Sequence, residues 1–154
     1  MKNHLEYLVN ADSQHLSVNF LFSSLSHAIF ELRVEKIKEL GIEFPQNFRF
    51  LEVLENHEGI IQKEFASRFN INQSTVTRSL NALEKEGLIK RTILENNKKN
   101  KVIVLTDRGR AVLKEMQNFD ANLENEMLKG LSETEIQEFK QYFMKMVKNI
   151  HELY

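Results

Sequence analysis

Residues 71–89 constrain the fold of this chain more than any other stretch. Their apolar side chains recur at spacings of four and three residues: Val76, Leu80 and Leu83. This period places them on one face of an amphipathic helix, turned toward a protein core. Asn72 is suited to cap the start of the helix, and Gly87 is suited to end it in a left-handed backbone conformation.

The opposite face of this helix carries hydrogen-bonding side chains and no carboxylate. Its members are short or planar apart from one flexible lysine: Ser74, Thr77, Arg78, Asn81 and Lys85. Such a face suits the phosphates and base edges of a DNA duplex, whereas a solvated face more usually includes glutamate. An ordinary surface helix is the alternative interpretation of this stretch taken alone.

The flanking segments favour DNA binding. A short upstream helix is predicted over residues 60–69, from apolar positions at Ile61, Phe65, Ala66 and Phe69. Two short helices joined by the polar turn 70–72 form a helix-turn-helix, whose second helix enters the major groove. Downstream, β-branched runs at 88–94 and 101–106 enclose a polar tip and predict a hairpin. The combination is a winged helix, with Lys98 and Lys99 placed to reach the DNA backbone or minor groove.

Residues 41–113 resemble the core of the MarR-type (multiple antibiotic resistance regulator) winged-helix transcription factors, and the resemblance extends over nearly the whole chain. Its most specific segments are STVTRSLNALEKEGLI and VIVLTDRG. The resemblance implies a dimer that binds a pseudo-palindromic operator in double-stranded DNA, often releasing it when a small-molecule effector binds. By position, the family's DNA-facing residues match Ser74, Thr75, Thr77, Arg78 and, at the wing tip, Lys98 and Lys99. With their neighbours Gln73 and Asn81, these form the candidate DNA-binding set.

Two features depart from the family pattern. The wing carries Asn97-Lys98-Lys99 where the family usually has an Asp-Arg-Arg-like run. Phe44 and Ile61 occupy positions where hydroxyl-bearing N-caps are common, so we expect other groups to cap those two helices.

The charge distribution agrees with a single DNA-binding face. Residues 60–101 contain nine Lys or Arg and four Glu, a net charge of +5, whereas the rest of the chain carries −6. A basic block within an acidic protein attracts an anionic polymer locally, while the acidic remainder repels it. The chain has no cysteine, which excludes disulfides, thiolate metal sites and cysteine nucleophiles.

Both ends of the chain predict helices that need a partner. A helix over residues 13–40, capped by Asp12 or Ser13 and ended by Gly41, is apolar nearly all round and must be buried on several sides. Residues 1–12 are expected to form a loose arm or a short helix. Pro45 begins the next helix, which precedes Gly59.

After the wing, Thr106 is expected to cap a helix that runs to about residue 129, and residues 132–135 predict a capping box for the last helix. The last helix carries an unbroken apolar stripe: Ile136, Phe139, Phe143, Met146, Ile150 and Leu153. We expect a homodimer held by helices within 13–40 and 107–153, around a winged-helix part at 45–106, in one domain of residues 1–154. A monomeric helical bundle is the alternative.

The predicted fold is therefore mostly α with a small β wing: a winged helix-turn-helix with N- and C-terminal dimerisation helices. The five glycines are at least 18 residues apart, so no phosphate-binding glycine loop exists, and no nucleophile elbow occurs. We expect no enzyme activity and no cofactor. The polar N-terminus and the absence of a long apolar run predict a cytoplasmic protein without a membrane partner.

Two alternatives remain for what this chain binds: a metal ion, or another protein in place of DNA. His15, His27 and His57, with Glu31 or Glu55 nearby, suggest a metal-responsive regulator, but their spacings match no short metal signature and we expect no metal site. A winged-helix module that binds protein is the other alternative. The leading prediction is a ligand-responsive DNA-binding regulator, with repression as the expected mode.

Overall fold

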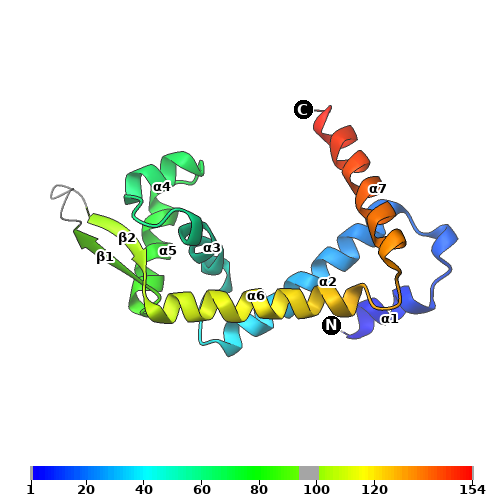
Figure 1. The fold of residues 1–154 in the computed structure, drawn as a ribbon, viewed down its shortest axis with the longest axis horizontal. Helices are drawn as coiled ribbons and strands as arrows, with labels where there is room; N and C mark the ends of the chain where they lie inside the picture. The colour runs from blue at the N-terminus through cyan, green and yellow to red at the C-terminus, as the bar shows by residue number, and fades with distance from the viewer. Residues whose placement is uncertain (1, 94–100, 154) are drawn as a thin grey trace. The chain divides into compact units, whose positions relative to one another are not determined.

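The computed structural model describes residues 2–93 and 101–153 of the protein (Figure 1). The chain divides into two compact units, Met1–Gln117 and Asn118–Tyr154. The first unit contains the helices α1 (Lys2–Asn10), α2 (Val18–Glu39), α3 (Phe48–Asn56), α4 (Gln62–Arg68) and α5 (Gln73–Lys85), the strands β1 (Ile89–Ile93) and β2 (Lys101–Leu105), and the first half of α6 (Asp107–Met127). The second contains the end of α6 and α7 (Glu133–His151). Short 3₁₀ turns, η1 (Ser13–His15) and η2 (Pro45–Asn47), precede α2 and α3.

The core of the first unit lies between α3, α4, α5 and the two strands. Each element contributes side chains that are almost completely buried: Leu51, Leu54, Phe65, Val76, Leu80, Leu83, Leu88, Ile89, Val102 and Ile103. Phe50 stacks on Phe65 with ring centroids 5.4 Å apart. The predicted core stripe of the helix at 73–85 is thereby confirmed, because all three of its apolar residues are buried.

The predicted hairpin is confirmed. Strands β1 and β2 pair antiparallel in a register that sets Ile89 opposite Leu105 and Ile93 opposite Lys101. The strand positions proposed at Leu94 and the wing tip lie outside the described residues.

Residues 60–61 are extended, although the sequence predicted them to be helical. The Ile103 N–H donates to the Ile60 carbonyl (3.0 Å), the Gly59 N–H donates to the Ile103 carbonyl (2.9 Å), and Ile61 forms a β-bridge with Val102. These hydrogen bonds hold the backbone extended, so α4 begins only at Gln62. Phe44 and Ile61 are the N-cap residues of η2 and α4, and neither side chain makes a capping hydrogen bond.

The start of α2 also corrects the sequence prediction. The helix begins at Val18 and not near residue 13, because the Ser17 side chain accepts a hydrogen bond from the Phe20 N–H (3.1 Å). Asp12 instead accepts from the Gln14 N–H (3.0 Å) and so caps the preceding η1 turn. The predicted end is confirmed, as Gly41 follows with a φ of +79°.

The start of α6 depends on Thr106, as predicted. Its hydroxyl accepts from the Gly109 N–H (3.0 Å) and donates to the Gly87 carbonyl (2.6 Å), so one side chain caps α6 and joins it to the end of α5. Val112, Leu113 and Met116 on α6 are buried. The helix ends at Met127, two residues before the predicted end.

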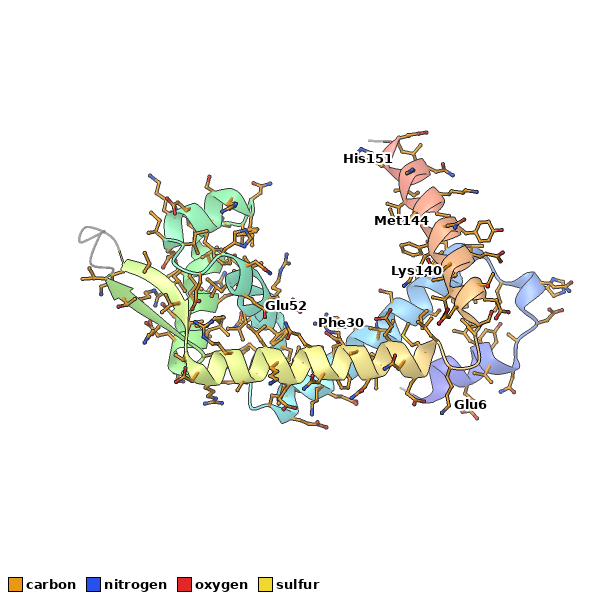
Figure 2. The ribbon with its side chains drawn as sticks, viewed as in Figure 1. Glu6, Phe30, Glu52, Lys140, Met144 and His151 are labelled. Carbon is orange, nitrogen blue, oxygen red and sulfur yellow. The ribbon has the colours of Figure 1, made fainter. Side chains whose placement is uncertain are left out.

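Helix α7 begins with the predicted capping box. The Ser132 hydroxyl accepts from the Glu135 N–H (3.3 Å), and the Glu135 carboxylate accepts from the Ser132 N–H (2.8 Å). None of the described α7 side chains is buried. Its large apolar side chains, among them the labelled Met144, stand exposed along the helix (Figure 2).

Candidate nucleic-acid interface

Helix α5 separates a buried apolar face from an exposed polar face. Val76, Leu80 and Leu83 have no accessible surface. Exposed on the other side are Gln73, Ser74, Thr75, Arg78, Asn81 and Lys85. The single carboxylate of the helix, Glu84, is ion-paired with Arg91 on β1. The exposed face of α5 is therefore polar, cationic and free of any unpaired carboxylate.

The beginning of α5 is fixed by Asn72. Its Oδ1 accepts from both the Ser74 N–H and the Ser74 hydroxyl, each at 2.8 Å. This is the predicted N-cap, and it satisfies one of the free N–H groups of the first helical turn. Because the hydroxyl hydrogen of Ser74 is used internally, the lone pairs of its oxygen remain to accept a bond from outside.

Thr77 is half-buried, unlike the other candidate residues of α5. Its hydroxyl donates to the Gln73 carbonyl (2.8 Å) and accepts from Nε2 of Gln62 on α4 (2.7 Å). The side chain consequently joins the two helices of the helix-turn-helix.

Sequence reasoning did not identify Arg91, which joins the wing to the helix-turn-helix. Its guanidinium binds the Glu84 carboxylate, Oδ1 of Asn81 (2.9 Å) and Oε1 of Gln62 (3.3 Å). The Arg91 N–H also donates to Glu84 (3.1 Å). The only sequence signal was an arginine two residues after a buried strand position, and its partners become neighbours only through the fold.

A cavity of about 350 Å³ lies between η2 and α5. Its walls are Phe44, Gln46, Asn47, Thr75, Arg78, Ser79 and Ala82. Asn47 and Ser79 are only 6% and 7% exposed. Within the described part of the chain, neither of these two side chains has a hydrogen-bond partner. Because both side chains line the cavity, they are available to a molecule that enters it.

Glu58 supports the base of the wing. Its Oε1 accepts from the Leu105 N–H at the end of β2 (2.8 Å) and from Nη2 of Arg110 on α6 (2.5 Å). The hydrogen bond from Arg110 lowers the pKa of Glu58, against the opposing effect of burial. The carboxylate therefore stays ionised near neutral pH and ties the loop after α3 to β2 and α6.

Glu86 connects the end of α5 with the segment after α2. Its Oε1 accepts from the Glu43 N–H (3.1 Å). Burial raises the pKa of Glu86, and the hydrogen bond from Glu43 only partly offsets that effect. The wing-tip candidates Lys98 and Lys99 lie outside the described residues.

Comparison with known proteins agrees with this geometry. Residues 45–101, which include α3, the helix-turn-helix and β1, match the model of the MarR family. The winged-helix part of the chain is therefore similar to the MarR family. This family consists of DNA-binding transcriptional regulators.

Solved MarR-family structures resemble the chain over most of its length. A complex of MepR from S. aureus with DNA matches with a TM-score of 0.74 at 25% identity, covering 86% of this chain and 98% of that one. The regulator SlyA matches with a TM-score of 0.64 at 29% identity, covering 89% and 96%. A Listeria monocytogenes protein assigned to the MarR family, in complex with 26mer DNA, matches with a TM-score of 0.65 at 27% identity, covering 88% and 89%.

The histidines singled out in the sequence each have a separate partner. His15 lies 3.6 Å from the Asp12 carboxylate and His27 lies 3.4 Å from that of Glu31, whereas His57 Nδ1 lies 3.0 Å from the Val53 carbonyl. Over residues 2–93 and 101–153, no group of three His, Asp or Glu side chains is arranged to hold a metal ion. No helix within those ranges is both long and apolar enough to cross a membrane.

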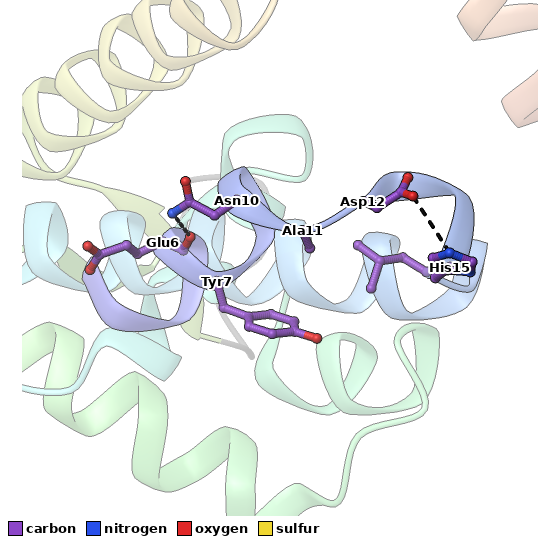
Figure 3. A pocket seen from close by; sticks show the side chains of 7 residues that line it. Glu6, Tyr7, Asn10, Ala11, Asp12 and His15 are labelled. Carbon is purple, nitrogen blue, oxygen red and sulfur yellow. Dashed lines mark hydrogen bonds and ion pairs between the residues drawn. The ribbon is translucent and has the colours of Figure 1, made fainter.

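A second cavity lies on the N-terminal segment, around α1 and η1 (Figure 3). It has a volume of about 710 Å³ and is lined by Glu6, Tyr7, Asn10, Ala11, Asp12, His15 and Leu16. Two of its polar groups are engaged with neighbours, since Nδ2 of Asn10 donates to the Glu6 carbonyl (2.8 Å) and His15 faces Asp12. None of the candidate DNA-binding residues lines it.

Proposed function

We propose that this MarR-like protein reads a specific sequence in double-stranded DNA by placing α5 in the major groove. The observation that carries the proposal is the exposed, carboxylate-free face of α5 behind a fully buried apolar face. Residues near the start of a recognition helix meet base edges, which assigns base reading to Gln73, Ser74, Thr75 and Arg78. Lys98 and Lys99 at the wing tip are assigned to phosphates or the minor groove.

The proposed active form is a homodimer. Helix α7 exposes apolar side chains along its length, including Phe139 (49%), Phe143 (40%) and Ile150 (57%). On α2, Phe30 is 63% exposed (Figure 2). Apolar surface of this extent marks an interface, and a second copy supplies a surface of the same kind. The chain then acts as one MarR-like domain, with dimerisation helices within 13–40 and 107–153 and a DNA-binding part at 45–106.

Two-fold symmetry has a consequence for the operator. A dimer places two copies of α5 about 34 Å apart, one turn of the duplex, so the preferred site is a pseudo-palindrome. A protein bound to such a site within a promoter excludes other proteins from it, which favours repression as the mode of regulation.

The proposed effector site is the cavity between η2 and α5. A small molecule there would pair with Asn47 and Ser79, whose side chains line the cavity, and would contact Thr75 and Arg78 from the side of the helix. Because Thr75 and Arg78 also belong to the proposed DNA-reading face, such a ligand would compete with the operator for the same side chains.

The test is DNA binding as a function of salt. The protein is incubated with a random pool of DNA duplexes, and the bound duplexes are selected and sequenced. The affinity for the recovered site is then measured at salt concentrations from about 50 to about 200 mM. The proposal expects a pseudo-palindromic site and a logarithm of affinity that falls linearly with the logarithm of salt concentration. Recovery of no preferred sequence would contradict it and would favour a winged-helix module that binds protein.

A further inference from the structure

Arg91 fixes the orientation of two side-chain amides. Its side chain is only 17% exposed and lies among α4, α5 and β1. Its Nη2 faces Oδ1 of Asn81 (2.9 Å) and Oε1 of Gln62 (3.3 Å). A guanidinium has hydrogen-bond donors and no acceptor, so the atom facing it in each amide has to be the carbonyl oxygen. The usual ambiguity between the oxygen and nitrogen of an amide is thereby removed.

The two amide nitrogens consequently point away from Arg91. The Gln62 nitrogen donates to the Thr77 hydroxyl (2.7 Å), which in turn donates to the Gln73 carbonyl (2.8 Å). Both bonds lie inside the helix-turn-helix. The Asn81 nitrogen has no partner among the residues that the structure describes, and Asn81 is exposed on the polar face of α5.

The Asn81 side chain therefore presents its amide N–H groups, while one of the two lone pairs of its oxygen is occupied by Arg91. Bidentate reading of adenine requires one donor and one acceptor of the same amide in the plane of the base, and the hydrogen bond to Arg91 ties the Asn81 oxygen to the protein. The partners of its N–H groups have to be acceptors, and DNA phosphate oxygens are acceptors only. Asn81 also lies two turns beyond the first residue of α5, whereas base edges are met by the first residues of a recognition helix.

The positive charge of Arg91 is not itself expected to bind a DNA phosphate. The Glu84 carboxylate binds both its guanidinium and its backbone N–H, and the side chain is mostly covered. An arginine neutralised in this way contributes little direct attraction for phosphate. Its effect on DNA binding would therefore pass through the groups that it orients.

We propose that Arg91 is a positioning residue that holds the Asn81 amide as a hydrogen-bond donor to a DNA phosphate. The inference rests on the proposed function, because it requires α5 to bind DNA. Asn81 then anchors the recognition helix on the backbone without reading a base, and Thr77 serves the internal network. Arg91 couples the wing strand to this anchor.

The experiment is a double-mutant cycle on the selected DNA site, using full-length protein. Asn81→Ala, Arg91→Lys and the combined variant are compared with wild type for affinity, base preference and melting temperature. Arg91→Lys keeps the charge next to Glu84 but cannot hold three partners in one plane. Each single variant is expected to bind about five- to tenfold more weakly, and the double variant no more weakly than Asn81→Ala alone, because the two residues act through one contact.

Base preference supplies an independent readout. A phosphate anchor leaves the ranking of base substitutions in the site unchanged in Asn81→Ala, while affinity for all sequences falls together. An altered preference at one position would instead assign Asn81 to a guanine edge and overturn the phosphate contact. If the double variant instead loses as much affinity as the two single losses multiplied together, the two residues act independently. That result would overturn the positioning role of Arg91 and make it a structural residue.

Asn81→Asp keeps the test valid if Arg91→Lys does not fold. Aspartate can still accept from Arg91 but has no donor and adds negative charge, so it is expected to bind all sequences more weakly than Asn81→Ala. Wild-type affinity in Asn81→Asp would refute the inference while leaving the proposed function standing. A wild-type protein that selects no DNA sequence would refute both, and that result appears before any variant is compared.

Discussion

Replacing Gly109 with alanine is expected to destabilise the first unit by about 3 kcal/mol. In an ordinary helix this change stabilises by about 1 kcal/mol, because alanine is the better helix former. Here a Cβ atom at residue 109 would lie 2.1 Å from the carbonyl oxygen of Leu88 and 3.4 Å from Cδ2 of Leu105. The first distance is far inside contact, and the obstructing atom belongs to the backbone.

The magnitude follows from what would have to move. The same Leu88 carbonyl accepts from the Thr106 N–H (3.0 Å), and Thr106 also caps α6 and binds the Gly87 carbonyl. Overpacking of a core costs roughly 1–3 kcal/mol. Weakening two of these hydrogen bonds costs about 1 kcal/mol each. Subtracting the helix gain of about 1 kcal/mol leaves about 3 kcal/mol.

The assay is urea unfolding followed by circular dichroism, with Gly130→Ala as the matched control. An added Cβ at residue 130 meets no atom within 4 Å, but its φ is +89°, so the control is expected to cost only the left-handed strain of roughly 1–2 kcal/mol. A Gly109→Ala protein as stable as wild type would refute the close approach of α6 to the backbone at Leu88, directly before β1.

Three further outcomes are expected. Replacing Lys98 and Lys99 with alanine should weaken binding to all DNA sequences about equally and reduce the salt slope by about 1–2, and an altered base preference with an unchanged slope would instead make the wing a base reader. Replacing Phe143 and Ile150 with glutamate would place charge in the proposed dimer interface, so sedimentation should show monomers and DNA-binding assays a much weaker operator affinity. A wild-type monomer at micromolar concentration would contradict the dimer. The hydrogen bond from Arg110 lowers the pKa of Glu58, so the ionised carboxylate stabilises the fold at any pH above the ordinary carboxyl pKa of 4.5. This stabilisation is lost as the pH falls through the pKa of Glu58 in the folded protein. The stability advantage of wild type over Glu58→Gln should therefore shrink between pH 7 and pH 3, and an advantage independent of pH would contradict the ionic pairing.

The sequence was most informative where local rules determine the structure. The core stripe of α5, its Asn72 cap, the Thr106 cap and the capping box at Ser132 each depend on residues within a few positions of one another. Periodicity and capping chemistry therefore predicted them correctly, and the hairpin followed from its two β-branched runs.

The sequence was less informative where partners are distant along the chain. The extended backbone at Ile60 depends on hydrogen bonds to Ile103, and no local pattern distinguishes it from the first turn of α4. Arg91 is 29 residues from Gln62 and ten from Asn81, so the network that they form appears only in the fold. The start of α2 was missed for another reason, since Asp12, Ser13 and Ser17 are all suitable caps and only one of them begins the long helix.

The most direct test of the central proposal is the affinity of Arg78→Ala for the selected DNA site, measured against Lys140→Ala. Both variants lose one positive charge, but Arg78 stands exposed on α5 whereas Lys140 lies on α7, outside the winged-helix part. Loss of a base or phosphate contact costs roughly 1–3 kcal/mol, so Arg78→Ala should bind about five- to 150-fold more weakly with an unchanged melting temperature. Lys140→Ala should bind as wild type does. Equal affinities for wild type and Arg78→Ala would contradict the assignment of α5 as the recognition helix.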